Sequence, residues 1–275
     1  MQDGHAHMDW KIVKEIYISH PFSLLQISPE TSIKSNIVFA TVNNSFEIHI
    51  YNSSMDPNDP ERLNTVRTLR GHENYINSIA FSSDSQLIAS GSDDHTCRIW
   101  EVKGSQDTLL TVLNFSSSIT SVQFNSEESE KLIIGEKCGT IFVYCLKLNQ
   151  SIYSFQTRHS PLFWLDWSSK NSQYVAVASG DQLLYFDITK SPVLLYSKRI
   201  HDIAKIVKIS KNNVLVTASV GGKASNDLKV MHQKSQIPII FEKLVACNGI
   251  AWHFSQPLLL VASDRKFAVY KVQVA

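Results

Sequence analysis

The segment from Leu69 to Trp100 decides the fold. It begins Leu69-Arg-Gly-His-Glu-Asn-Tyr-Ile-Asn-Ser-Ile-Ala-Phe-Ser-Ser83 and continues Gln86-Leu-Ile-Ala-Ser-Gly-Ser-Asp-Asp-His-Thr-Cys-Arg-Ile-Trp100. Short apolar runs of strand length alternate here with turns rich in Gly, Ser, Asn and Asp, and no stripe with the helical period of 3.6 residues runs through them. The segment therefore predicts antiparallel strands joined by tight turns.

This pattern recurs along the chain. A large apolar residue followed by Ser or a similar turn residue marks each recurrence, at Ile27, Phe81, Phe124, Trp167, Ile209 and Trp252. The intervals after Phe81 are 43, 43, 42 and 43 residues, whereas the first interval is 54 residues. The longer interval contains the polar stretch 52–60, whose two prolines predict an exposed loop. Six units of this length, each with room for four short strands, predict an all-β fold, a six-bladed β-propeller.

The units leave little of the chain unassigned, so we expect one propeller domain over residues 10–275 after a short disordered N-terminus, residues 1–9. The last unit offers only three evident strands: 249–252, 258–261 and 267–272. An additional strand, Trp10–Ile18, precedes the first unit and has no partner of its own. We predict that it closes the ring as the outer strand of the last blade, because an unpaired strand edge invites aggregation.

The composition argues against several classes of function. Lys and Arg number 26 against 25 Asp and Glu, a formal charge of +1, so the basic excess of proteins that bind nucleic acid directly is missing. No apolar run approaches the roughly twenty residues of a membrane helix, which argues against membrane insertion. The start, Met1 to Asp9, has neither the basic nor the apolar part of a signal peptide. Four cysteines without Cys-x-x-Cys spacing indicate buried, reduced thiols.

Gly71-His72, Ser90-Gly-Ser-Asp-Asp94 and Ile99-Trp100 together resemble a WD40 repeat. The resemblance implies that His72, Ser90, Asp94 and Trp100 form the hydrogen-bonded structural tetrad of that family. Imidazole can donate and accept, the indole N–H only donates, and a carboxylate anchors the series. The other five units lack Gly-His and Trp-Asp, and Cys138 occupies the place of the turn Asp in the third unit. We therefore expect these blades to be stabilised mainly by apolar packing.

Further pieces, at 136–141, 186–189, 222–225 and 249–253, narrow the match to the WD40 nucleoporins of thirty-seven kilodaltons. The resemblance implies a non-enzymatic scaffold subunit of the Y-shaped complex of the nuclear pore, which supports pore assembly and transport of protein and mRNA. Its implied partners are the large propeller-plus-helix nucleoporin and other Y-complex subunits, at the nuclear envelope and at kinetochores in mitosis. Family propellers usually have seven blades, and this chain matches from the second blade onward. We therefore expect one of two arrangements: a ring that closes with six blades, or a shortened form whose ring is open or strained.

The sequence contains only weak candidates for catalytic, cofactor-binding or metal-binding sites. Gly222-Lys223 lacks the remaining residues of a phosphate loop, and His5, His7 and Asp9 lie in a terminus expected to be frayed. We predict no catalytic, cofactor-binding or metal-binding residues. A partner surface is expected on the loops that share a face with His72. Its candidate residues are Glu73, Asn74, Tyr75, Asp93, His95, Arg158, Asp181, Asp264 and Arg265.

Two other functions compete with the scaffold. Propellers that serve as substrate adaptors of ubiquitin ligases commonly end a blade with Trp-Asp-x-Arg, from which Trp100-Glu-Val-Lys103 departs at two positions. A propeller hydrolase would need acidic residues at equivalent inward positions of several blades, and the sequence does not show them. Fold alone does not decide among these functions, because propellers host many.

Overall fold

The computed structural model describes residues 18, 21–31, 36–54, 63–103, 108–189, 192–213, 215–223, 226–235, 237–247, 249–253, 255–263 and 266–272. Within these ranges every regular element is a β-strand, and no helix is long and apolar enough to span a bilayer. The expected disordered terminus, 1–9, and all of the predicted strand 10–18 except Ile18 lie outside the described residues.

The strands form six antiparallel sheets, each a meander in chain order. The first sheet contains β1 (Phe22–Ile27), β2 (Asn36–Asn43), β3 (Ile48–Ser54) and β4 (Leu63–Leu69). The second contains β5 (Ile76–Phe81), β6 (Leu87–Ser92), β7 (Thr96–Glu101) and β8 (Thr108–Asn114). The third contains β9 (Ile119–Phe124), β10 (Lys131–Glu136), β11 (Thr140–Cys145) and β12 (Gln150–Gln156).

The remaining three sheets follow the same order. The fourth contains β13 (Leu162–Trp167), β14 (Tyr174–Ser179), β15 (Gln182–Asp187) and β16 (Val193–Arg199). The fifth contains β17 (Ala204–Ile209), β18 (Val216–Gly221), β19 (Asn226–His232) and β20 (Ile240–Leu244). The sixth has three strands in the described residues: β21 (Gly249–Trp252), β22 (Leu258–Ser263) and β23 (Lys266–Lys271).

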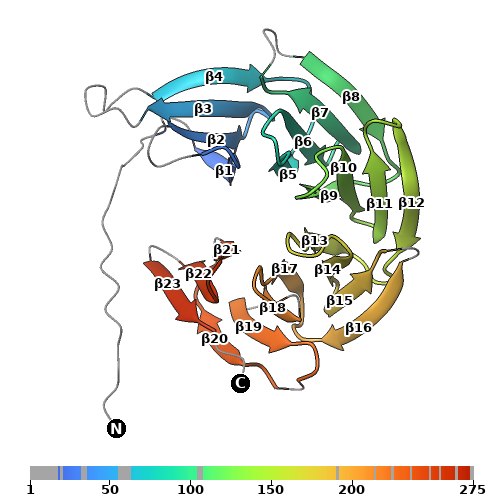
Figure 1. The fold of residues 1–275 in the computed structure, drawn as a ribbon, viewed down its shortest axis with the longest axis vertical. Coiled ribbons are helices and arrows are strands. Elements are labelled where there is room, and N and C mark those ends of the chain that lie inside the picture. The colour runs from blue at the N-terminus through green and yellow to red at the C-terminus, as the bar shows by residue number, and fades with distance from the viewer. Residues whose placement is uncertain are drawn as a thin grey trace.

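Figure 1 shows the sheets as blades that follow one another around a common centre, with the first strand of each blade innermost. All six repeat residues predicted from the sequence, Ile27, Phe81, Phe124, Trp167, Ile209 and Trp252, end an innermost strand. The repeat residue therefore occupies the same structural position in every blade, the last residue of the innermost strand. This confirms the all-β, six-bladed propeller and the repeat boundaries.

Apolar side chains fill the spaces between consecutive blades. Each of the five junctions, from the first and second blades to the fifth and sixth, has its own buried cluster. Between the sixth and first blades the described residues form no such cluster. There, Phe22, Leu25 and Ile27 on β1 are exposed by 46%, 48% and 53%, unlike the buried inner strands of other blades. The described chain thus has six blades and five apolar junctions.

Candidate functional site

Strand order decides which loops share a face of the propeller. In an antiparallel blade, the turn between the second and third strands lies at the same end as the connection to the next blade. We call this end the His72 face and the other end the opposite face. The candidate partner residues Glu73, Asn74, Tyr75, Asp93, His95, Arg158 and Asp181 all occupy such turns and connections. Asp264 and Arg265 lie outside the described residues.

The structure brings the four tetrad residues together in the second blade. His72 Nδ1 lies 2.7 Å from Asp94 Oδ2, and His72 Nε2 lies 2.7 Å from Ser90 Oγ. The indole N–H of Trp100 donates to Ser90 Oγ at 2.9 Å. With Nδ1 protonated, His72 donates to the carboxylate and accepts from the serine, so each group in the series has a partner. The network ties the connection before β5 to the strands β6 and β7.

Asp94 also organises its own turn. Its Oδ1 accepts from the Thr96 hydroxyl at 2.6 Å and the Thr96 N–H at 2.9 Å, and its Oδ2 accepts from the Glu73 N–H at 3.1 Å. Burial alone would raise the pKa of Asp94, but these hydrogen bonds and that of His72 together lower it to about 2. The pKa of His72 is lowered, because burial favours the neutral imidazole and outweighs Asp94, which acts to raise that pKa. This arrangement holds the turn between β6 and β7 and joins it to the connection before β5.

A second histidine–serine pair, missed in the sequence, lies in the fifth blade. His201 Nε2 is 3.0 Å from Ser219 Oγ, with the same 18-residue separation as His72 and Ser90. Searching for that spacing alone would have found it. The strand register places Met231 opposite Thr217, where the second blade has Trp100 opposite Ile88. The fifth blade therefore keeps the histidine and serine and loses the indole donor.

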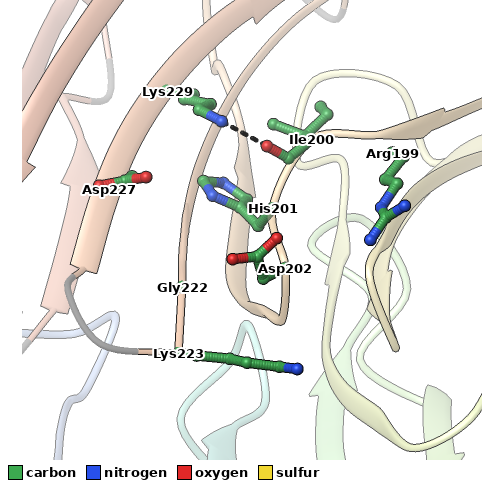
Figure 2. Close-up of a pocket in the computed structure, with 8 residues that line it drawn as sticks. All are labelled: Arg199, Ile200, His201, Asp202, Gly222, Lys223, Asp227 and Lys229. Atoms are coloured by element: carbon green, nitrogen blue, oxygen red, sulfur yellow. Dashed lines mark hydrogen bonds between the residues drawn. The ribbon is translucent and has the colours of Figure 1, made fainter.

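The altered tetrad borders a polar pocket of about 390 Å³, shown in Figure 2. His201 lies in the middle of the view, with Lys223 extended below it and Lys229 above it. The Lys229 ammonium donates to the Ile200 carbonyl. His201 Nδ1 is buried and, among the described residues, has no hydrogen-bond partner. Burial, and next the nearby Lys229 ammonium, lower the pKa of His201 to about 4. The imidazole is therefore neutral near pH 7.

The third blade holds the same connection in another way. Glu136, at the end of β10, accepts from the Ser116 N–H at 2.8 Å, the Ser116 hydroxyl at 2.9 Å and the Ser117 N–H at 3.0 Å. Cys138, at the position of the turn Asp, is exposed and its thiol donates to Glu136 Oε2 at 3.3 Å. A buried carboxylate thus replaces the histidine network. The second and third blades therefore secure the corresponding loop with different side chains.

The candidate surface residues differ in how freely they project. Tyr75 is 60% exposed and His95 is exposed at the tip of its turn. Asp93 is held within the structure, because its Oδ1 accepts a hydrogen bond from Asn77 Nδ2 at 2.8 Å. Asp181 pairs with Arg199 at 2.8 Å beside the pocket of the fifth blade.

The described ranges contain no group of three or more His, Cys, Asp or Glu side chains placed to hold a metal ion. Cys97 and Cys145 are buried, whereas Cys138 is exposed and Cys247 is partly buried, so burial of the thiols is only partial. All four are free thiols.

The model of the WD domain, G-beta repeat family matches residues 63–101, the part that holds the tetrad. The chain is 30% identical over 257 residues to nucleoporin Nup37 of Drosophila melanogaster, covering 92% of this chain and 77% of that protein. It is 33% identical over 254 residues to nucleoporin Nup37 of Homo sapiens and 31% identical over the same length to that of Mus musculus. Each of these matches covers 90% of this chain and 76% of the relative.

Proposed function

The chain belongs to the nucleoporin Nup37 family, and from this premise we propose that it is a non-enzymatic scaffold subunit of the nuclear pore complex. Within the Y-shaped complex it docks on the large propeller-plus-helix nucleoporin and contacts other Y-complex subunits. By this contact it supports pore assembly and the transport of protein and mRNA at the nuclear envelope. The kinetochore role implied by the sequence resemblance has no support among the relatives and is left out of the proposal.

The observation that carries the proposal is similarity over nine tenths of the chain to proteins named as nucleoporins. The architecture fits a scaffold, because five buried junctions hold the blades rigidly and present fixed loops on one face. In the described residues the titratable groups with clear hydrogen-bonded roles, such as Asp94 and Glu136, hold loops. A near-neutral chain suits a protein interface with aromatic and Arg contacts better than electrostatic capture of a polyanion.

The test is to tag the chain in its own cells, purify it gently and identify its partners by mass spectrometry. Recovery of the large nucleoporin together with other Y-complex subunits is the expected result. Recovery of cullin-type ligase subunits without pore proteins would instead favour the substrate-adaptor function. Recovery of neither set from cells with intact pores would overturn the scaffold assignment.

A further inference from the structure

One turn position on the His72 face is occupied in an unusual way. The register places Val42 opposite Ile48, Gly91 opposite Cys97 and Gly135 opposite Ile141, so the turns after β2, β6 and β10 have equal length. Two residues before the second member of each pair, the backbone has positive φ in all three blades. The residues there are Phe46 (φ 61°), His95 (φ 66°) and Gly139 (φ 98°).

Glycine is the natural occupant of this position, because a Cβ crowds the backbone when φ is positive. The third blade has glycine, whereas the first two blades hold aromatic side chains in the same conformation. His95 is exposed, so burial of its ring does not offset the strain. Backbone strain that persists at an exposed side chain is a reason to look for function there.

The two aromatic turns are joined by Tyr75. Its ring meets the Phe46 ring edge-on, with centroids 5.1 Å apart and planes at 78°. Its carbonyl accepts from the Asp93 N–H at 2.8 Å, in the turn that carries His95. Tyr75 remains 60% exposed despite both contacts. The Phe46 and Tyr75 rings thus form one aromatic surface, and the backbone hydrogen bond places the turn with the exposed His95 next to Tyr75. We call Phe46, Tyr75 and His95 the aromatic patch.

The charges around the patch are mainly negative. Glu73 is exposed in the connection before β5, and Glu47 and Asp93 lie in the two turns. The charges of Glu47 and Arg70 cancel in an ion pair at 2.7 Å. Arg98, whose Nε–H donates to Thr96 Oγ1 at 3.4 Å, keeps its positive charge, so the excess negative charge comes from Glu73, Asp93 and Asp94. A complementary partner therefore presents an apolar side chain with Lys or Arg beside it, and its guanidinium or ammonium can also lie over the Tyr75 ring.

We propose that the aromatic patch is the docking surface for a segment of the large nucleoporin in which an apolar anchor stands next to Lys or Arg. This inference rests on the proposed function, because it names the surface by which the scaffold contact is made. Tyr75 supplies the central contact, since exposed Tyr and Arg side chains dominate the energetics of protein interfaces. Phe46 supports the Tyr75 ring, and His95 extends the surface onto the second blade.

The experiment measures the dissociation constant between the full chain and the purified large nucleoporin of the same organism by calorimetry. Tyr75→Ala is expected to weaken binding by about tenfold or more. The matched control is Leu148→Ala, because Leu148 is also 60% exposed but lies in the turn after β11, on the opposite face. We expect that control to bind like the unmodified chain.

His95→Gly separates docking from folding. Because glycine relieves the strained φ, the variant is expected to melt about 1–4 °C higher while binding the large nucleoporin more weakly. Glu73→Lys is expected to weaken binding, and to do so more at low salt than at high salt, because salt screens charge interactions. Its control is Glu130→Lys, which should leave binding unchanged because Glu130 is exposed on the opposite face.

The outcomes distinguish the two proposals. Failure of the unmodified chain to bind the large nucleoporin would overturn the proposed function itself. Tight binding that Tyr75→Ala, His95→Gly and Glu73→Lys all leave unchanged would overturn the docking surface and keep the scaffold function. Loss of binding with Leu148→Ala instead would place the contact on the opposite face and also reject the aromatic patch.

Discussion

At the scale of single residues, Trp100 links packing to hydrogen bonding. The side chain is 3% exposed, it packs in the cluster between the first and second blades, and it donates to Ser90. Trp100→Ala is expected to lower the free energy of unfolding by about 3–5 kcal/mol, because it leaves a cavity and removes the donor to Ser90. Urea denaturation followed by circular dichroism measures this loss.

Trp100→Phe is the matched control for that prediction. It keeps one aromatic ring but removes the N–H and the five-membered part of the indole, so we expect a smaller loss than for alanine. A loss below about 1 kcal/mol for Trp100→Ala would mean that the tetrad does not stabilise this blade.

The pH dependence of stability also belongs to single residues. The pKa of His201 falls from an ordinary 6.5 to about 4 on folding, so the unfolded chain takes up a proton first as the pH drops. The neutral His201 therefore makes its full contribution to the free energy of unfolding above pH 6.5. This contribution, about 3 kcal/mol, is lost as the pH falls toward 4. His201→Gln can still donate to Ser219 but does not titrate. We expect its unfolding free energy to vary less with pH in this window, as urea melts at several pH values would show.

Asp94 contributes in a separate range of pH. Its pKa is lowered from 3.8 to about 2, so its stabilising effect is present above pH 4 and is lost as the pH falls toward 2. The His201→Gln variant should therefore retain the acid loss below pH 4. If the unfolding free energy of His201→Gln instead varied with pH between 6.5 and 4 as much as that of the unmodified chain, His201 would not be neutral and buried in the folded state.

At the scale of the strand, glycines set how closely neighbouring segments approach. A Cβ on Gly221, the last residue of β18, would lie 2.1 Å from the Ile203 carbonyl oxygen and 2.7 Å from the His201 ring. Because the nearest atom belongs to the backbone, Gly221→Ala is expected to destabilise the protein by about 1–3 kcal/mol. Gly249, at the start of β21, is the control, since nothing lies within 4 Å of its added Cβ. Thermal melts in which both alanine variants behave alike would contradict the close approach.

The strands also show how far the sequence predicts the structure. The inner strands were predictable because each ends in a large apolar residue, and from Phe81 onward this residue recurs every 42 or 43 residues. The His201–Ser219 pair was not predicted because the family motif also includes a turn Asp and a Trp, and the fifth blade has no Trp and no Asp at 222–225. Phe46 escaped for a different reason. Positive φ at a phenylalanine depends on the register of β2 with β3, which residue types in a turn do not specify.

At the scale of the whole molecule, stability is distributed over the junctions between blades. Five junctions are filled by buried clusters. The sixth blade differs from the others because no described strand pairs with the outer edge of β23, and Phe267 on that strand is 78% exposed. The other five blades place a fourth strand at that position. Unpaired strand edges favour association with other chains, so a propeller gains from covering this one.

We expect residues 10–18 to pair with β23 and complete the sixth blade, which would join the two ends of the domain. Deletion of residues 1–18 should then lower the melting temperature by several degrees and promote aggregation, because it removes a strand and exposes an edge. Deletion of residues 1–9 is the matched control and should leave the melting temperature unchanged, since those residues precede the strand. Hydrogen exchange should show slow amides in 10–18 and β23 of the full chain and fast amides in β23 after the longer deletion. Equal melting temperatures for both deletions, with fast exchange at 10–18, would show that the blade is not completed by its own N-terminus.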